Sequence, residues 1–143
     1  MPAITPRILL IEDNVERIQV FRKWIADTEF VLIEASSAGR ARGILRKGMT
    51  DGIAGVCLDH DLELQPVTES DLHLSASNLI DAITTSLPRQ TPILIHSMNA
   101  SKPVGMQRRL TAGGFSVTRI RMAALTQEMF GEWLADVRDN WDP

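Results

Sequence analysis

The sequence predicts a single α/β domain built on a doubly wound parallel β-sheet of five strands. Five short apolar runs alternate along the chain with longer segments of helical periodicity, which is typical of repeated βα units. The first run, which ends in residues 8–11, is apolar at consecutive positions, as a strand covered on both faces of a sheet requires. Right-handed crossovers between such strands place helices on both faces. Polar clusters end three of the runs, and in open parallel sheets ligands bind at that edge.

The composition predicts one globular domain over residues 1–143, with no output domain. The chain has 143 residues, 44% of them hydrophobic and 23% charged, and a formal net charge of −3. So mild a charge indicates neither a nucleic-acid backbone nor an anionic membrane as a bulk partner. No apolar stretch is long enough to cross a bilayer, and the N-terminus lacks a secretion signal. We therefore expect a cytoplasmic protein in which the one cysteine, Cys57, is a reduced core residue.

The expected strands are short, and the expected helices begin at capping residues and end at glycine or proline. The strands are residues 7–11, 30–34, 53–58, 92–96 and 115–120. The helix boundaries are an Asn14 cap for the first, Ser36 or Ser37 to Gly48 for the second, Ser75 or Ser77 to Pro88 for the third, and 104–112 for the fourth. The first helix is expected to bury Val15, Ile18, Phe21, Trp24 and Ile25, and the last Leu125, Met129, Phe130, Trp133, Leu134 and Val137. Residues 63–74 show no periodicity and predict a long loop, either a lid or a flexible insertion.

Carboxylates gather where the first and third strands end. Glu12 and Asp13 follow the first strand, and Asp59 and Asp61 end the third. Like charges brought close together require a cation or a proton. Oxygen ligands of this kind suit Mg²⁺ or another divalent cation, so we expect these four acids to form a metal site. The alternative is that Asp13 or Asn14 only caps the first helix, which leaves Glu12 and Asp59 unexplained.

Two of the three histidines, His60 and His96, stand at predicted strand ends. A histidine titrates near neutral pH, so the pair could act on a phosphate ester as general base and general acid, with Asp59 as the third catalytic group. The alternative is a hydrogen-bonded structural histidine at each strand end.

Groups able to bind phosphate follow the fourth strand and lie on the fifth. Ser97 and Asn99 offer hydrogen-bond donors. Arg119 and Arg121 are two residues apart on a strand, so they face the same side and could clamp an anion. The alternative is that at least one arginine belongs to the solvated surface of an edge strand.

These residues resemble a known family. Residues 9–14, LLIEDN, are similar to the acidic first-strand end of two-component receiver domains. Asp59 stands where receivers carry their phosphoacceptor aspartate, and Ser97 where they carry a fourth-strand hydroxyl. The resemblance covers nearly the whole chain and implies the flavodoxin-like strand order 2-1-3-4-5. Receivers place a lysine after the fifth strand, where this chain has residues 118–122, TRIRM.

A narrower group resembles the chain more closely. Residues 58–62, LDHDL, together with 96–99, HSMN, and then Gly105-Met106 and Leu110, look like the receiver-derived family named for cyclic-phosphate processing. This resemblance implies that Asp and His residues at the strand ends bind or hydrolyse a cyclic phosphate, carried by RNA or by a nucleotide.

Three functions therefore stay open. The first is a metal-assisted phosphoesterase that acts on a phosphate-bearing small molecule or an RNA end. The second is a stand-alone response-regulator receiver that a histidine kinase or another signalling partner engages and that is phosphorylated on Asp59. The third is an inactive receiver-like adaptor. The two histidines favour the first function, and the missing lysine weighs against the second.

Overall fold

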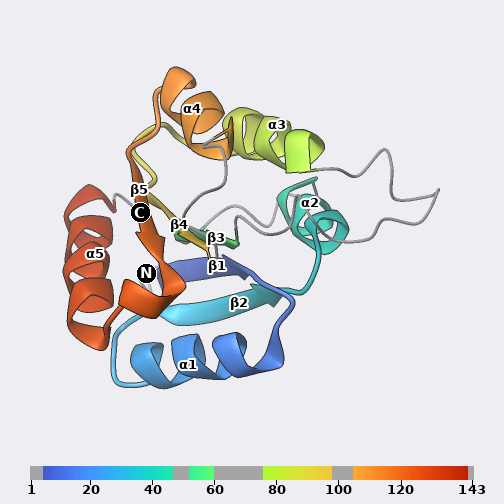
Figure 1. Cartoon of the computed structure of the whole chain (residues 1–143). Coiled ribbons are helices and arrows are strands. Elements are labelled where there is room, and N and C mark those ends of the chain that lie inside the picture. The colour runs from blue at the N-terminus through green and yellow to red at the C-terminus, as the bar shows by residue number, and fades with distance from the viewer. Residues whose placement is uncertain (1–4, 47–51, 60–75, 98–104, 142–143) are drawn as a thin grey trace.

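A computed structural model describes residues 5–46, 52–59, 76–97 and 105–141, and the structural statements below concern these residues (Figure 1). Five parallel strands form one sheet in the order β2-β1-β3-β4-β5, which confirms the predicted fold class and strand order. The strands are β1 Arg7–Ile11, β2 Val31–Ala35, β3 Ile53–Asp59, β4 Ile93–Ser97 and β5 Val117–Arg121. The helices are α1 Val15–Ile25, α2 Ala38–Arg46, α3 Ala76–Ser86, α4 Gly105–Ala112 and α5 Gln127–Asn140.

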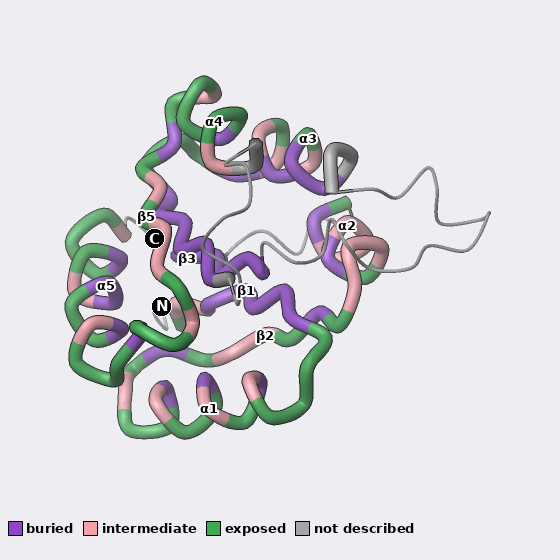
Figure 2. The backbone as a smooth tube through the Cα atoms, viewed as in Figure 1, coloured by how far each residue is buried: buried purple, intermediate pink, exposed green. Residues whose placement is uncertain are grey.

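The helices cover both faces of the sheet, so the structure has three layers (Figure 1). Helices α1 and α5 pack on one face, which we call the α1/α5 face, and α2, α3 and α4 pack on the other. Figure 2 shows that burial is concentrated in the central strands, while the helices turn their exposed sides outward. Every residue of β3 is buried, as a central strand covered on both faces should be. The apolar runs of the sequence therefore mark the middle of the molecule.

Helix α5 approaches the sheet closely at Gly55 of β3. A Cβ atom at this position would lie 2.9 Å from Cη2 of Trp133 and 3.0 Å from Cγ2 of Val137. Both residues belong to the apolar stripe that was predicted for the last helix, and both are buried. The absence of a side chain at Gly55 is therefore what lets α5 lie against the central strand.

Helix α1 begins where the sequence predicts. Oδ1 of Asn14 accepts a hydrogen bond from the backbone N–H of Arg17 at 3.0 Å, which satisfies one of the free donors at the helix N-terminus. Of the residues expected to face inward, Ile18 and Phe21 are buried, but Val15 is 66% exposed. Val15 is the first residue of α1, directly after the cap, and at this position its side chain faces solvent and not the sheet.

Strand and helix boundaries differ from the predicted ones by a residue or two. Strand β2 runs one residue further than predicted, β3 extends to Asp59 and β4 to Ser97, because backbone pairing with the neighbouring strand continues. Strand β5 starts at Val117 instead of residue 115, because its pairing with β4 begins there. Helix α5 is preceded by a 3-10 turn at Met122–Ala124 that the periodicity did not predict. The predicted loop at 63–74 and the predicted stop at residue 48 lie outside the described residues.

Cys57 is fully buried in the centre of the sheet, as expected, and it forms no disulfide. Burial raises the pKa of its thiol well above the ordinary value, because a thiolate would lose its hydration. None of the described helices is long and apolar enough to cross a membrane.

Candidate functional site

The register of three adjacent strands brings three polar side chains together on the α1/α5 face. On the three central strands, Leu10, Cys57 and Leu94 are among the buried residues of this face. Side chains two residues apart on a strand point to the same face. Two residues after these core positions come Glu12, Asp59 and His96. Asp59 and His96 are also paired directly in the β3–β4 register. All three polar residues are only 1% exposed.

The carboxylate of Glu12 is the centre of the cluster. Its Oε1 accepts a hydrogen bond from Nε of Arg17 at 2.6 Å and faces Nε2 of His96 at 3.0 Å. Its Oε2 accepts from Nη2 of Arg17 at 3.1 Å and from the backbone N–H groups of Asp13 and Asn14 at 2.9 and 3.1 Å. A buried carboxylate needs such partners, because an isolated charge is costly to remove from water.

These contacts set the protonation states of Glu12 and Arg17. Burial by itself raises the pKa of Glu12, but the hydrogen bonds from His96 and Arg17 and from the backbone outweigh it, so the pKa lies well below its ordinary value. The same contact with Glu12 raises the pKa of Arg17. Glu12 and Arg17 are therefore a carboxylate and a guanidinium at any physiological pH.

Arg17 connects the buried carboxylate to two further acids. Its Nη2 lies 3.8 Å from Oδ2 of Asp59 and 4.0 Å from Oδ1 of Asp13. The Arg17 side chain is 19% exposed and the Asp13 side chain 46% exposed, whereas the side chain of Asp59 is 2% exposed. Arg17 and Asp13 thus form the outer side of the cluster, with Asp59 and Glu12 beneath them.

His96 lies on the inner side. Its ring packs against Phe21 of α1, with ring centroids 5.0 Å apart. Because an ionised carboxylate only accepts hydrogen bonds, the contact with Glu12 requires a proton on Nε2. Nδ1 is buried and has no hydrogen-bond partner among the described residues. His96 therefore donates a hydrogen bond to Glu12 from the side of the cluster that packs on α1.

The cluster offers donor atoms for a metal ion. Glu12, Asp59 and His96 each present one ligand atom, and these atoms lie within 4.8 Å of one another. With Arg17 in place, however, the arrangement does not fit a divalent cation. Both oxygens of Glu12 already accept hydrogen bonds, Nε2 of His96 carries a proton, and a guanidinium borders Asp59. A second cation would meet the repulsion of the first.

The structure brings some of the predicted site residues together and not others. Glu12, Asp59 and His96 are neighbours, and Asp13 lies at the outer side of their cluster. His60, Asp61 and Asn99 and the side chain of Ser97 lie outside the described part of the chain.

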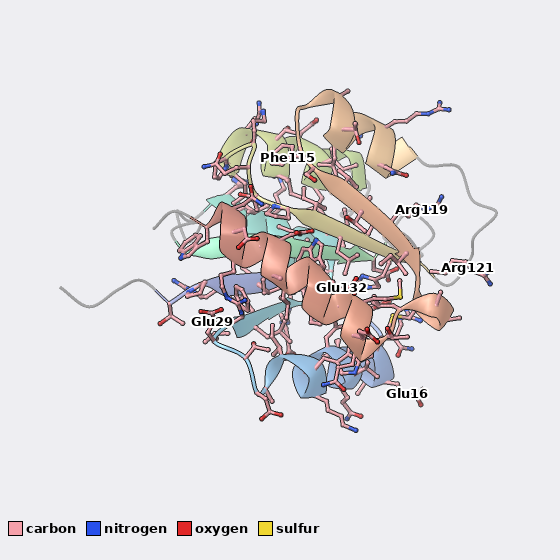
Figure 3. The ribbon with its side chains drawn as sticks, turned by 90° about the vertical axis from the view of Figure 1, so that its left-hand side faces the viewer. Glu16, Glu29, Phe115, Arg119, Arg121 and Glu132 are labelled. Carbon is pink, nitrogen blue, oxygen red and sulfur yellow. The ribbon has the colours of Figure 1, made fainter. Side chains whose placement is uncertain are left out.

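The two arginines of β5 do not join this cluster. Arg119 and Arg121 alternate along the strand with Ile120, which packs on the α1/α5 face. Their side chains consequently leave the sheet on the opposite face from Glu12 and Asp59. Figure 3 shows both arginines on β5, the edge strand of the sheet. A shared clamp with the acids would need these side chains to reach around the strand end.

Arg17 is the site residue that the sequence analysis missed. On the predicted helix it is one of several polar residues with no distinguishing neighbour except Asp13, four positions earlier. An acid and an arginine at that spacing predict an ordinary pair on a helix surface. Only the position of the first turn of α1 over the strand ends shows that Arg17 reaches the buried acids.

The fold of the chain is that of receiver domains. A response regulator receiver protein from Sinorhizobium medicae WSM419 superposes with a TM-score of 0.69 at 18% identity, covering 96% of this chain and 98% of that one. A signal receiver domain of an HD domain-containing protein from Pseudomonas fluorescens Pf-5 gives 0.69 at 13% identity, covering 94% of each chain. Chemotaxis protein CheY4 of Vibrio cholerae gives 0.64 at 15% identity, covering 93% of this chain and 98% of that one.

No protein-family model and no curated protein sequence matches the chain. At identities below one fifth, the similar structures show a shared fold and not a shared activity. The resemblance to the cyclic-phosphate processing group consequently stays a prediction.

Proposed function

We propose that this chain is a receiver-like signalling module in which Asp59 accepts a phosphoryl group. The observation that carries the proposal is the position of Asp59: it ends the central strand β3, with buried Glu12 beside it and a guanidinium nitrogen of Arg17 3.8 Å from its Oδ2. In open parallel sheets this edge is where ligands bind. A carboxylate next to a cation at that edge is suited to receive a phosphoryl group.

The reaction would be a simple transfer. An oxygen of Asp59 forms a bond to phosphorus, the bond between phosphorus and the donor breaks, and the donor leaves with the electron pair. The product carries additional negative charge next to Glu12 and Asp13, so it needs a nearby cation. Arg17 is such a cation and takes over the charge balance for which receivers use a lysine. The proposal assigns no step to a metal ion.

The partners would be those of a signalling module. A histidine kinase or a small phosphodonor would supply the phosphoryl group, and a protein that docks on the modified domain would receive the signal. We propose the whole of residues 1–143 as one such domain, working in the cytoplasm, where Cys57 stays reduced.

Phosphorylation can be tested by intact mass after incubation with acetyl phosphate. The expected result is a mass increase of one phosphoryl group in the wild-type protein and none in Asp59→Asn. Arg17→Gln should be modified more slowly, while Arg22→Gln should behave as the wild type, because Arg22 pairs with Glu34 on the surface. A wild-type protein that gains no mass while Asp59 is intact and the fold is native would reject the proposal.

A second candidate is the phosphoesterase, and the pair of Glu12 and His96 favours it. The pair lies next to Asp59, the third predicted catalytic group, and its 3.0 Å contact would hold the base of the site in place during catalysis. Because His96 is buried against Phe21, His60 would have to be the histidine that touches the substrate. Turnover of 2′,3′-cyclic nucleotides by the purified protein, lost in His60→Gln, would support this function. No turnover with any of these nucleotides, with or without Mg²⁺, would reject it.

A further inference from the structure

We infer that Arg17 competes with divalent metal ions for the cluster of Glu12, Asp13 and Asp59: its guanidinium is the resident cation of these three acids and weakens the binding of a divalent ion among them. The inference rests on the same cluster of acids as the proposed function. It depends on the position of one side chain and not on whether Asp59 is phosphorylated.

The first support is the geometry of Arg17. The guanidinium contacts both oxygens of Glu12, through Nε at 2.6 Å and Nη2 at 3.1 Å. The same Nη2 is 3.8 Å from Asp59 and 4.0 Å from Asp13. One planar group therefore lies within 4.0 Å of all three acids, which is the position that a bound divalent cation would need.

The second support is the balance of charge. Three carboxylates at the ends of β1 and β3 repel one another unless a cation lies among them. Arg17 already neutralises the buried Glu12, whose two oxygens are fully occupied by donors. A divalent ion entering beside Asp59 would meet the positive charge of Arg17 a few ångströms away, which opposes its binding.

The third support is the partly exposed position of Arg17. Arg17 lies in the first turn of α1, three residues after the N-cap Asn14, and its side chain is 19% exposed. Rotation into solvent would remove one donor from each oxygen of Glu12 and the positive charge from beside Asp59. A metal ion and the inward-facing guanidinium are therefore alternative cations among Glu12, Asp13 and Asp59.

The inference can be tested by measuring Mn²⁺ and Mg²⁺ affinity by isothermal titration calorimetry. Arg17→Gln keeps a hydrogen-bonding side chain but loses the charge, so it should bind Mn²⁺ about tenfold or more tighter than the wild type. Arg22→Gln removes an arginine from the same helix, away from these acids, and should leave the Mn²⁺ affinity unchanged. Adding Asp59→Asn to Arg17→Gln should abolish the gain in Mn²⁺ affinity, which would show that the ion binds at Asp59. An affinity that Arg17→Gln leaves unchanged or weakens would overturn the inference.

A measurement on the wild-type protein covers the case in which Arg17→Gln does not fold. The Nε–H of Arg17 should be protected from hydrogen exchange without metal, because it donates to buried Glu12. When Mg²⁺ saturates the protein, that protection should be lost. If Mg²⁺ saturates the protein and the Arg17 Nε–H stays protected, the metal ion and the guanidinium bind among the acids at the same time, and the inference fails. Both readouts are independent of phosphorylation, so failure of the proposed function leaves them interpretable.

Discussion

Nε2 of His96 lies 3.0 Å from Oε1 of Glu12, and each of the two residues is only 1% exposed. The contact joins β4 to the end of β1 across the intervening strand β3, so it fixes the positions of Glu12 and His96 relative to each other. Asp59 lies between them on β3. The pair therefore provides a rigid support for the one carboxylate that we propose as reactive.

Removing the charge of Glu12 should destabilise the protein strongly. Glu12→Gln keeps one acceptor oxygen but removes the negative charge that pairs with Arg17, and breaking a buried pair in this way costs about 3–5 kcal/mol. Glu34→Gln is the matched control, because Glu34 pairs with Arg22 on the surface, where the loss is about 0–1 kcal/mol. Urea denaturation of both variants measures the two free energies of unfolding. Equal losses would contradict the central role of Glu12.

The stability contribution of Glu12 should also depend on pH. Its pKa in the native protein lies below the ordinary value of 4.5 that it has in the unfolded chain. The contribution is therefore fully present above about pH 4.5 and is lost as the pH falls towards the native pKa, because the unfolded chain binds a proton first. The difference in unfolding free energy between wild type and Glu12→Gln should be constant near neutrality and narrow below about pH 4.5. A difference that does not narrow on acidification would show that the Glu12 charge is not what stabilises the fold.

His96 should behave as a supporting residue. His96→Ala removes a buried donor to Glu12 and should lower the free energy of unfolding by about 1–3 kcal/mol. His96→Gln keeps a donor and should recover part of the loss. If Asp59 is the phosphoacceptor, the folded fraction of both variants should still gain a phosphoryl group in the intact-mass assay. Loss of the modification in a stable, folded His96→Gln protein would instead place His96 in contact with the reacting group.

Gly55 should not tolerate a side chain. The Cβ of Gly55→Ala would lie 2.9 Å from the Trp133 ring, so helix α5 would have to shift, and such overpacking costs about 1–3 kcal/mol. Gly131→Ala, on α5 itself, meets no atom within 4 Å and should stabilise the helix by about 0.5–1 kcal/mol. Thermal unfolding of the two variants gives changes of opposite sign if α5 packs as described. A neutral or stabilising Gly55→Ala would contradict this packing.

Cys57 should be unreactive in the native protein. Its thiol is fully buried, and burial raises its pKa, so hardly any thiolate is present or accessible. Iodoacetamide should alkylate the protein only after denaturation, which mass spectrometry detects at a single site because the chain has one cysteine. Alkylation at the same rate with and without urea would show that β3 is not at the centre of a stable sheet.

The order of the elements follows from the sequence because the signals for strands and helices are local. Consecutive apolar residues predicted each buried strand, and residues such as Asn14 predicted the start of a helix, without reference to the rest of the chain. The neighbouring positions of Glu12, Asp59 and His96 were also predictable in part, since each follows a strand and parallel strands end at one edge. The exact ends of β3 and β4 were not, because they depend on pairing with neighbouring strands.

The tertiary structure alone decided which groups this site combines. The register places Glu12, Asp59 and His96 on the α1/α5 face and Arg119 on the other, and a shift of one residue would have reversed this. The packing of α1 buries His96 against Phe21 and brings Arg17 onto the carboxylates. Neither contact leaves a pattern in the sequence, because each depends on how far and at what angle a helix crosses strands that are distant along the chain.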